Sequence, residues 1–468
     1  MTACRNDSSA PSVAVLGGGL AGITAAWSAR QAGCRVTLFE RGRHLGGRIA
    51  SLEVHASLAQ AAKLLDNGEH IWLAACLAVD KLFQELELKQ YFDLSPGIHF
   101  ACGGGHFWSL NACRWLPRRF ALLPSLMRLP NLTFRERCHL IHIARLLLNA
   151  HDDSLAPFTF SKWYNEQGGR PRPAQFFWQP LILSSLSDMP DQVSALAVKK
   201  IILEGVLFCS GKNLGLYLPN LPLREIFHDA VFKKFQEEGI DVRFHSRITQ
   251  LLSEGPRITA VCGPDGGHEP FDAVINATGP FAAAQLFADS GLDAELQRIA
   301  FERFELGAIT TVHLWLDRPI TKKKAIALTG TPGQWLFANR GVIASSELPW
   351  YAQILISGSH RLLDGSELTS GQREQLAHRI FLQLQEQFPH AKAARLMASR
   401  VSTILDAVIS PSPESFGKRP GCMTAFDNLF LAGDWTDTHW PSTMEAAVRS
   451  GRLAVESLLA QRNRARAS

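Results

Sequence analysis

The chain has 468 residues, 46% of them hydrophobic and 19% charged, with a formal net charge of +5. This length exceeds what one core usually holds and predicts a globular protein of two domains, while the small positive excess does not indicate nucleic-acid binding. The nine cysteines include no CxxC pair, which favours reduced thiols over a disulfide framework or a metal site.

The first predicted unit is a strand, a helix and a second strand, at residues 13–16, 20–32 and 35–39. The loop after the first strand, Gly17–Gly22, fits the pattern G-x-G-x-x-G. Gly17 permits the tight turn, Gly19 lets the backbone approach a pyrophosphate, and Gly22 lets the helix pack closely on the strand. The helix begins at Leu20 and Ala21, where unpaired N–H groups would face phosphate oxygens. The loop therefore predicts dinucleotide binding.

Further candidate cofactor residues follow this loop. Glu40 lies 18 residues after Gly22, at the end of the second strand, where an acid binds a ribose hydroxyl, and Arg41 stands beside it. Gly46 and Gly47 permit a second close backbone approach, and Arg48 can pair with a phosphate. These three residues resemble the glycine-glycine-arginine signature of the flavin amine oxidase superfamily, which implies FAD rather than NAD.

The C-terminal part holds a second candidate half of the same site. A buried strand at 429–432 ends in Gly433 and Asp434, and a helix follows. Ser442 and Glu445 have the spacing of a capping box at the start of that helix. In FAD enzymes of this superfamily the Gly-Asp carboxylate binds the ribityl chain. Thr443 and Met444, at the helix start, would face the pyrimidine end of the flavin.

Other elements are expected between these two ends of the chain. Residues 76–150 are predicted to be mostly helical, with a further helix at 226–238 and strands at 241–244 and 273–277. Val242 would lie against the adenine. A strand is expected at 310–316 and a helix at 372–387. The N-terminal unit alone has too few strands for a complete doubly wound sheet, so the nucleotide domain is expected to be discontinuous in sequence.

Two longer strings carry a narrower resemblance. Residues 66–70, Asp-Asn-Gly-Glu-His, resemble the Asp-Asn-Gly-Gln-His motif of the hydroxysqualene dehydroxylases, also called squalene-associated FAD-dependent desaturases. The string Asp434 to Gly451 is similar to theirs as well. The resemblance covers residues 13–459. Two features differ: Glu69 replaces the usual glutamine, and residues 56–65 have a more helical pattern than the usual strand hairpin.

The resemblance implies an α/β fold with a Rossmann-like FAD-binding domain and an α+β substrate domain, as in amine oxidases and desaturases. We expect the FAD-binding domain at 1–75, 226–290 and 416–468, and the substrate domain at 76–225 and 291–415. The implied reaction is reductive removal of the hydroxyl from hydroxysqualene to give squalene, a hopanoid precursor. The electrons would come from an external donor, either a reduced flavin or NAD(P)H acting through FAD.

This reaction needs an acid that helps the hydroxyl leave as water. Glu69, His70 and Asp437 are the candidates; His70 has an ordinary pKa near neutrality, and an apolar pocket would raise that of Glu69. The alternative is that Glu69 and His70 only form hydrogen bonds near the flavin. Rival functions are a carotenoid (phytoene) desaturase, an amine oxidase, or a non-catalytic FAD-stabilised scaffold at a membrane.

Residues 114–148 form the other unusual segment. Apolar side chains such as Trp115, Leu116 and Phe120 alternate with arginines, and Glu136 is the one acid among them. Such a surface suits an anionic membrane, although a core element with a solvated basic face fits the pattern equally well. The chain shows no signal peptide and no apolar run long enough to span a membrane, which predicts a cytoplasmic location, with peripheral attachment to the inner face of the plasma membrane as an option.

Overall fold

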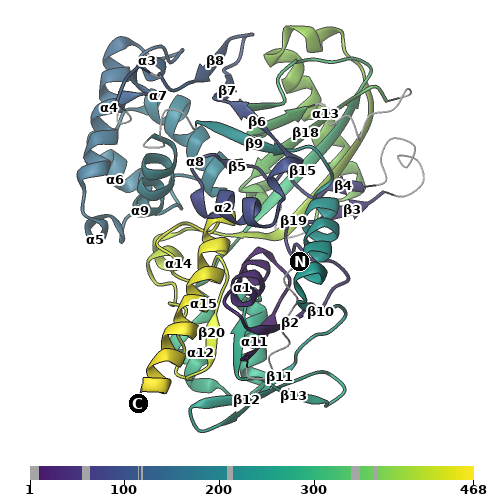
Figure 1. Ribbon diagram of the computed structural model, residues 1–468. Coiled ribbons are helices and arrows are strands. Elements are labelled where there is room, and N and C mark those ends of the chain that lie inside the picture. The colour runs from purple at the N-terminus through teal and green to yellow at the C-terminus, as the bar shows by residue number, and fades with distance from the viewer. Residues whose placement is uncertain are drawn as a thin grey trace.

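A computed structural model describes residues 10–54, 64–113, 115–117, 120–207, 214–338, 348–362 and 367–467. Figure 1 shows the N-terminal strands and the C-terminal helix in one lower body, with a helical lobe and a large sheet above it. All seven cysteines within these ranges are free thiols.

The lower body is built on a five-stranded parallel sheet. Its strand order is β10 (Asp241–Arg243), β2 (Arg35–Phe39), β1 (Ser12–Leu16), β14 (Ala273–Asn276) and β20 (Leu429–Leu431). Both faces are covered, which is why these strands are nearly continuous apolar runs. The strands come from three distant parts of the chain, and the domain boundaries given above stay a prediction.

Each face of this sheet has its own core. Val13, Val15 and Leu38 pack against one set of helices, whereas Ala14, Leu16 and Val274 pack against a second layer. The first set is α1 (Leu20–Gln31), α2 (Leu77–Glu85), η6 (Glu225–Ala230), α10 (Val231–Glu238) and α15 (Met444–Ala467). The second layer is β11 (Gln250–Glu254), β12 (Arg257–Cys262), β13 (His268–Pro270), α11 (Pro280–Asp289) and α12 (Asp293–Ile299).

A seven-stranded mixed sheet forms the wall of the upper body (Figure 1). Its order is β19 (Leu396–Ile409), β15 (Leu306–Leu316), β18 (Trp350–Ser357), β17 (Trp335–Ala338), β16 (Ala325–Leu328), β7 (Ile98–Ala101) and β8 (Phe107–Leu110). One face packs on α13 (Ser370–Gln387) through Val312, Leu314 and Ile354. The opposite face turns toward the middle of the molecule.

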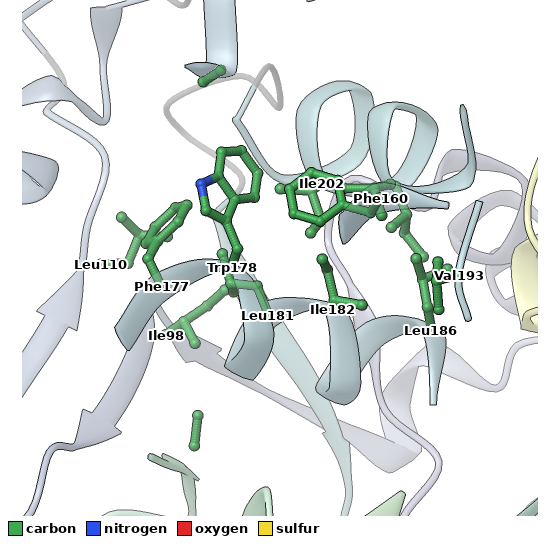
Figure 2. Close-up of a cluster of buried hydrophobic side chains, with 14 of the residues drawn as sticks. Ile98, Leu110, Phe160, Phe177, Trp178, Leu181, Ile182, Leu186, Val193 and Ile202 are labelled. Atoms are coloured by element: carbon green, nitrogen blue, oxygen red, sulfur yellow. The ribbon is translucent and has the colours of Figure 1, made fainter. Parts of the chain in front are cut away.

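The helical lobe supplies the largest apolar cluster. Figure 2 shows Trp178 between Phe177 and Phe160, with both ring centroids 5.2 Å from it. Trp178 and Ile182 are completely buried. The lobe comprises α3 (Leu123–Leu126), α4 (Phe134–Asn149), α5 (Asp152–Leu155), α6 (Phe160–Glu166), α7 (Pro171–Pro173), η4 (Ala174–Trp178), α8 (Gln179–Leu186), α9 (Ala195–Val198) and η5 (Lys199–Leu207).

Two small sheets join the bodies and correct two expectations. β3 (Ser51–Glu53) pairs with β4 (Leu64–Asp66), and β9 (Gly215–Pro219) lies between β5 (Trp72–Leu73) and β6 (Phe92–Pro96). The mostly helical prediction for 76–150 is therefore wrong at β6, β7 and β8, because β6 and β7 pair with the distant β9 and β16, and β8 forms a hairpin with β7. Leu65 lies in a strand rather than a helix, and residues 56–63 of that prediction lie outside the described ranges.

Candidate functional site

The glycine loop between β1 and α1 is packed so closely against other backbone atoms that a side chain would not fit at Gly17 or Gly22. Gly17 has φ +102°, and a Cβ atom there would lie 3.0 Å from the Ala277 carbonyl oxygen. A Cβ on Gly22 would lie 1.8 Å from the Gly17 carbonyl oxygen. Gly19 is the extended residue that precedes Leu20, the first residue of α1. The first N–H groups of the helix, at Leu20 and Ala21, have no partner within the helix.

The second glycine turn packs directly on the first. The Gly46 N–H donates to the Gly18 carbonyl oxygen at 2.8 Å, and a Cβ on Gly47 would lie 2.9 Å from the Gly19 Cα. Two glycine backbones in contact leave a bare backbone surface beside the positive end of α1. The residues present therefore fit a pyrophosphate, which needs close backbone approach and N–H donors.

The predicted adenosine-side residues lie at the carboxyl ends of neighbouring strands. Glu40 follows β2, and its carboxylate accepts 2.6 Å hydrogen bonds from the N–H groups of Gly18 and Gly42. Arg41 is exposed beside it. Val242 on β10 is half-buried and lies opposite Leu38 of β2. The structure therefore brings Glu40 and Val242 to the same edge as the glycine loop.

The loop after β20 reaches this edge from the C-terminal part. Gly433 has φ +142°, and its N–H donates to Ser450 Oγ at 2.8 Å. The Asp434 carboxylate, 8% exposed, lies 2.5 Å from Arg48 Nη2. The Ser442 hydroxyl donates to the Asp434 carbonyl oxygen at 2.9 Å. The two halves predicted from distant parts of the sequence thus meet in one place.

The predicted capping box at the start of α15 is wrong. Ser442 bonds Asp434 instead, while Glu445 accepts hydrogen bonds from the N–H groups of Ala78 and Val79, at 3.0–3.2 Å. Glu445 is 1% exposed and also pairs with Arg449 at 2.9 Å. It therefore caps α2, a helix far away in sequence. Thr443 and Met444 remain at the start of α15, both half-buried.

A buried arginine that the sequence analysis missed supports the Gly-Asp loop. Arg419 Nη1 donates to the Asp434 carbonyl oxygen at 3.1 Å, and the guanidinium lies 4.5 Å from the ring centroid of Phe416. Burial lowers the pKa of Arg419 to about 10, an effect that Asp437 and Asp434 oppose, so it stays charged at neutral pH. Arg419 directly precedes Pro420, and no local pattern in the sequence indicates that its side chain is buried.

The segment at residues 66–70 is anchored from several sides. The Asp66 carboxylate accepts from Ser51 Oγ at 2.6 Å and from the Leu223 N–H at 2.9 Å, which gives it a structural role. Asn67 Nδ2 donates to the Arg48 carbonyl oxygen at 2.9 Å. Asn67 Oδ1 is buried without a hydrogen-bond partner among the described residues. Such an atom beside Arg48 fits a bound polar group.

The three candidate acids have different surroundings. Glu69 is 9% exposed and lines a cavity of about 100 Å³, while His70 Nδ1 lies 3.1 Å from the Gly68 carbonyl oxygen. Asp437 has a side chain 37% exposed; it accepts from the His439 N–H at 2.9 Å and lies 3.8 Å from Arg419 Nη2. Glu69 and His70 thus share one segment, whereas Asp437 belongs to the loop after β20.

A covered parallel sheet with a glycine cradle and a distant Gly-Asp loop defines an FAD-dependent oxidoreductase of the amine oxidase type. The family model for flavin-containing amine oxidoreductases matches residues 20–459, and the chain belongs to that family. Its cofactor is FAD, as the sequence predicted.

The chain is similar to proteins that act on isoprenoids. It is 27% identical to the hydroxysqualene dehydroxylase of Rhodopseudomonas palustris, over 96% of this chain and 98% of that protein. It is 22% identical to the zeta-carotene desaturase of Synechocystis sp., over 97% and 98% of the two chains. A solved oxidoreductase from Methanosarcina mazei has a TM-score of 0.67 at 16% identity, covering 96% of this chain and 100% of that one. The predicted fold class is confirmed.

Proposed function

We propose that the chain removes the hydroxyl group of hydroxysqualene reductively and releases squalene. The similarity to the hydroxysqualene dehydroxylase of R. palustris over nearly the whole length of both chains carries this proposal. The chemistry that FAD supplies when bound and reduced is a hydride for the carbon that loses oxygen. The electrons come from an external donor, a reduced flavin or NAD(P)H.

The FAD would be held by the residues that meet at the edge of the parallel sheet. Gly17, Gly19, Gly46 and Gly47 form the cradle for the pyrophosphate, with the N–H groups of Leu20 and Ala21 behind it. Glu40 is assigned to the ribose and Val242 to the adenine. Asp434 is assigned to the ribityl chain, and Thr443 and Met444 to the flavin ring. In this arrangement Arg48 and Arg41 neutralise phosphate charge.

Of the three acids expected from the sequence, Glu69 and His70 are better placed than Asp437 to contact the leaving hydroxyl. Glu69 is 9% exposed and lines a cavity of about 100 Å³, where it can meet the oxygen of a substrate. Asp437 has a side chain 37% exposed, lies 3.8 Å from Arg419 Nη2 and does not line that cavity.

A membrane contact through part of residues 114–148 would give access to a hydrocarbon substrate. Trp115 is 95% exposed, and Leu116 and Phe120 are exposed as well. Other apolar side chains of the segment are core: Leu122, Leu126, Leu129 and Leu132 are buried, in line with the alternative named above, although Phe134 is 67% exposed. Arg114, Arg118 and Arg119 lie outside the described residues. Within the described part of the chain, no helix has the length and apolarity needed to cross a bilayer.

Product analysis separates this proposal from its rivals. The holoenzyme is incubated with hydroxysqualene and, separately, with phytoene or zeta-carotene, with FAD either oxidised or reduced. We expect squalene from hydroxysqualene with reduced FAD only. New double bonds in a carotenoid with oxidised FAD would favour the desaturase, for which the similarity to the zeta-carotene desaturase is the supporting observation. No turnover of any isoprenoid by a flavin-loaded protein would favour the scaffold.

A further inference from the structure

The inner face of the seven-stranded sheet carries a cluster of four polar side chains at positions where buried apolar side chains would be expected. Thr311 and His313 alternate on β15, and Tyr351 and Gln353 alternate on the neighbouring β18. All four are buried, with exposed fractions of 0–2%. The opposite face of the same strands is apolar and packs on α13. Buried polar groups are costly unless they are paired, so a cluster of four calls for a function.

Hydrogen bonds fix this cluster against the segment that carries the candidate acids. His313 Nδ1 lies 2.7 Å from Tyr351 Oη. The Gln353 amide donates to the Asp66 carbonyl oxygen at 3.3 Å, and the Thr311 hydroxyl donates to the Asn67 carbonyl oxygen at 2.8 Å. The cluster and residues 66–70 therefore form one unit.

Tyr351 and Gln353 line the same cavity as Glu69, a space of about 100 Å³. Phe337, Leu218 and Pro219 supply apolar walls to the same cavity. A water occupies roughly 30 Å³ of liquid, so this space holds a small polar end of a molecule or about three waters. It is too small for a C30 chain. The cavity thus suits one oxygen-bearing end of an otherwise apolar substrate.

The cavity has a route to water. It shares Asp93, Leu218 and Lys324 with a larger hollow of about 560 Å³ at the surface. Lys324 Nζ and Asp93 Oδ2 form an ion pair of 2.7 Å at this boundary, with both side chains about half exposed. Exposed ion pairs are weak, so the boundary can open to water at little cost.

We propose that Tyr351, oriented by His313, binds the substrate hydroxyl and donates the proton with which it leaves. This inference rests on the proposed function. A neutral His313 with its proton on Nδ1 donates to Tyr351 Oη, which turns the phenolic hydrogen away from the imidazole. His313 is a positioning residue, and Glu69, which lines the same cavity, is a second partner for the substrate oxygen.

The step balances without a further reactant. The carbon–oxygen bond breaks with both electrons on the oxygen, and the Tyr351 proton moves to that oxygen, which leaves as water. The carbon takes the hydride already assigned under the proposed function. The His313 Nδ1–H stabilises the tyrosinate until it regains a proton from water entering past Asp93 and Lys324.

The test compares binding of hydroxysqualene and squalene to the holoenzyme with oxidised FAD, where no turnover occurs. Radiolabelled ligands are equilibrated with the protein in detergent micelles. The wild type should bind hydroxysqualene about tenfold more tightly than squalene, because the hydroxyl adds one hydrogen bond in a desolvated site. Tyr351→Phe should lose that preference, keep its affinity for squalene, and slow turnover roughly 10²–10⁴-fold with reduced FAD. The control is Tyr217→Phe, which removes a phenolic hydroxyl outside the cavity. It should change neither the preference for hydroxysqualene nor the turnover rate.

The His313 variants distinguish positioning from mere packing. His313→Asn keeps a polar atom near the Nδ1 position and should retain most of the preference, whereas His313→Leu should lose it. If Tyr351→Phe does not fold, the difference between these two His313 variants still tests the proposed role of Tyr351. An undiminished preference and turnover in Tyr351→Phe, or equal behaviour of the two His313 variants, overturns this inference alone. A wild type that neither prefers nor converts hydroxysqualene overturns the proposed function, and this inference with it.

Discussion

Arg48 and Asp434 stand 386 residues apart in the chain, yet Arg48 Nη2 lies 2.5 Å from Asp434 Oδ1. The pair joins the glycine turn after β2 to the Gly-Asp loop after β20. Asp434 is nearly buried, and its carbonyl oxygen is held by Arg419 and Ser442. Two parts of the proposed nucleotide site that depend on opposite ends of the chain are therefore fixed to each other.

Replacing Asp434 tests the assignment of this loop to FAD. Asp434→Ala removes a buried acceptor and should weaken FAD binding by about 1–3 kcal/mol, roughly 5–150-fold. Glu40→Ala should weaken binding from the adenosine side. Flavin absorbance per protein after exhaustive dialysis measures both, and denaturation should release free, non-covalent FAD. Asp427→Ala, just before β20, is the control. Full flavin occupancy in both site variants would show the assignment to be wrong.

Glu445 should matter for stability because it connects two helices. Its carboxylate is 1% exposed and bonds the first N–H groups of α2 as well as Arg449. Glu445→Ala leaves these donors unpaired and should lower the free energy of unfolding by about 1–3 kcal/mol. Urea titration of the FAD-free protein provides the measurement. Glu456→Ala, exposed on the same helix, should have an effect within about 0.5 kcal/mol. Equal midpoints for the two variants would contradict the capping role.

Membrane binding should depend on Trp115, Leu116 and Phe120. Changing all three to Ser removes exposed apolar area and should lower partitioning into phosphatidylglycerol-containing vesicles at least about tenfold. High salt should weaken binding of the wild type, since exposed arginines such as Arg128 are screened. The control is Leu252→Ser/Phe281→Ser/Met423→Ser, comparable exposed side chains on the other body. Equal pelleting of both triple variants would favour the alternative, in which the segment is a core element with a solvated basic face.

The parts of the fold that sequence could predict are those with local causes. Gly22 is required by the contact with the Gly17 carbonyl oxygen inside one short unit, and Gly17 by its positive φ, so the β-α-β start was visible from spacing alone. The strands at 273–276 and 429–431 were visible because a sheet covered on both faces needs continuous apolar runs.

What the sequence could not show depends on partners far along the chain. Glu445 has the spacing of a local cap, but α2 brings better donors to it. β6 and β7 pair with β9 and β16, and no local pattern announces those partners. His313 and Tyr351 are two of several polar residues in mainly apolar strands. Only the register of β15 and β18 places them together beside Glu69.

The central claim is that the enzyme reduces hydroxysqualene at the expense of reduced FAD. The most direct measurement is a single anaerobic turnover, in which holoenzyme carrying one reduced FAD is mixed with hydroxysqualene in deuterium oxide. Loss of a hydroxyl with gain of hydrogen is a two-electron reduction, so one squalene should form for each FAD oxidised. Because N5 hydrogen exchanges with solvent, one deuterium should appear at the carbon that lost oxygen. Squalene formed by fully oxidised enzyme with no reductant present, or squalene without deuterium at that carbon, would contradict the account.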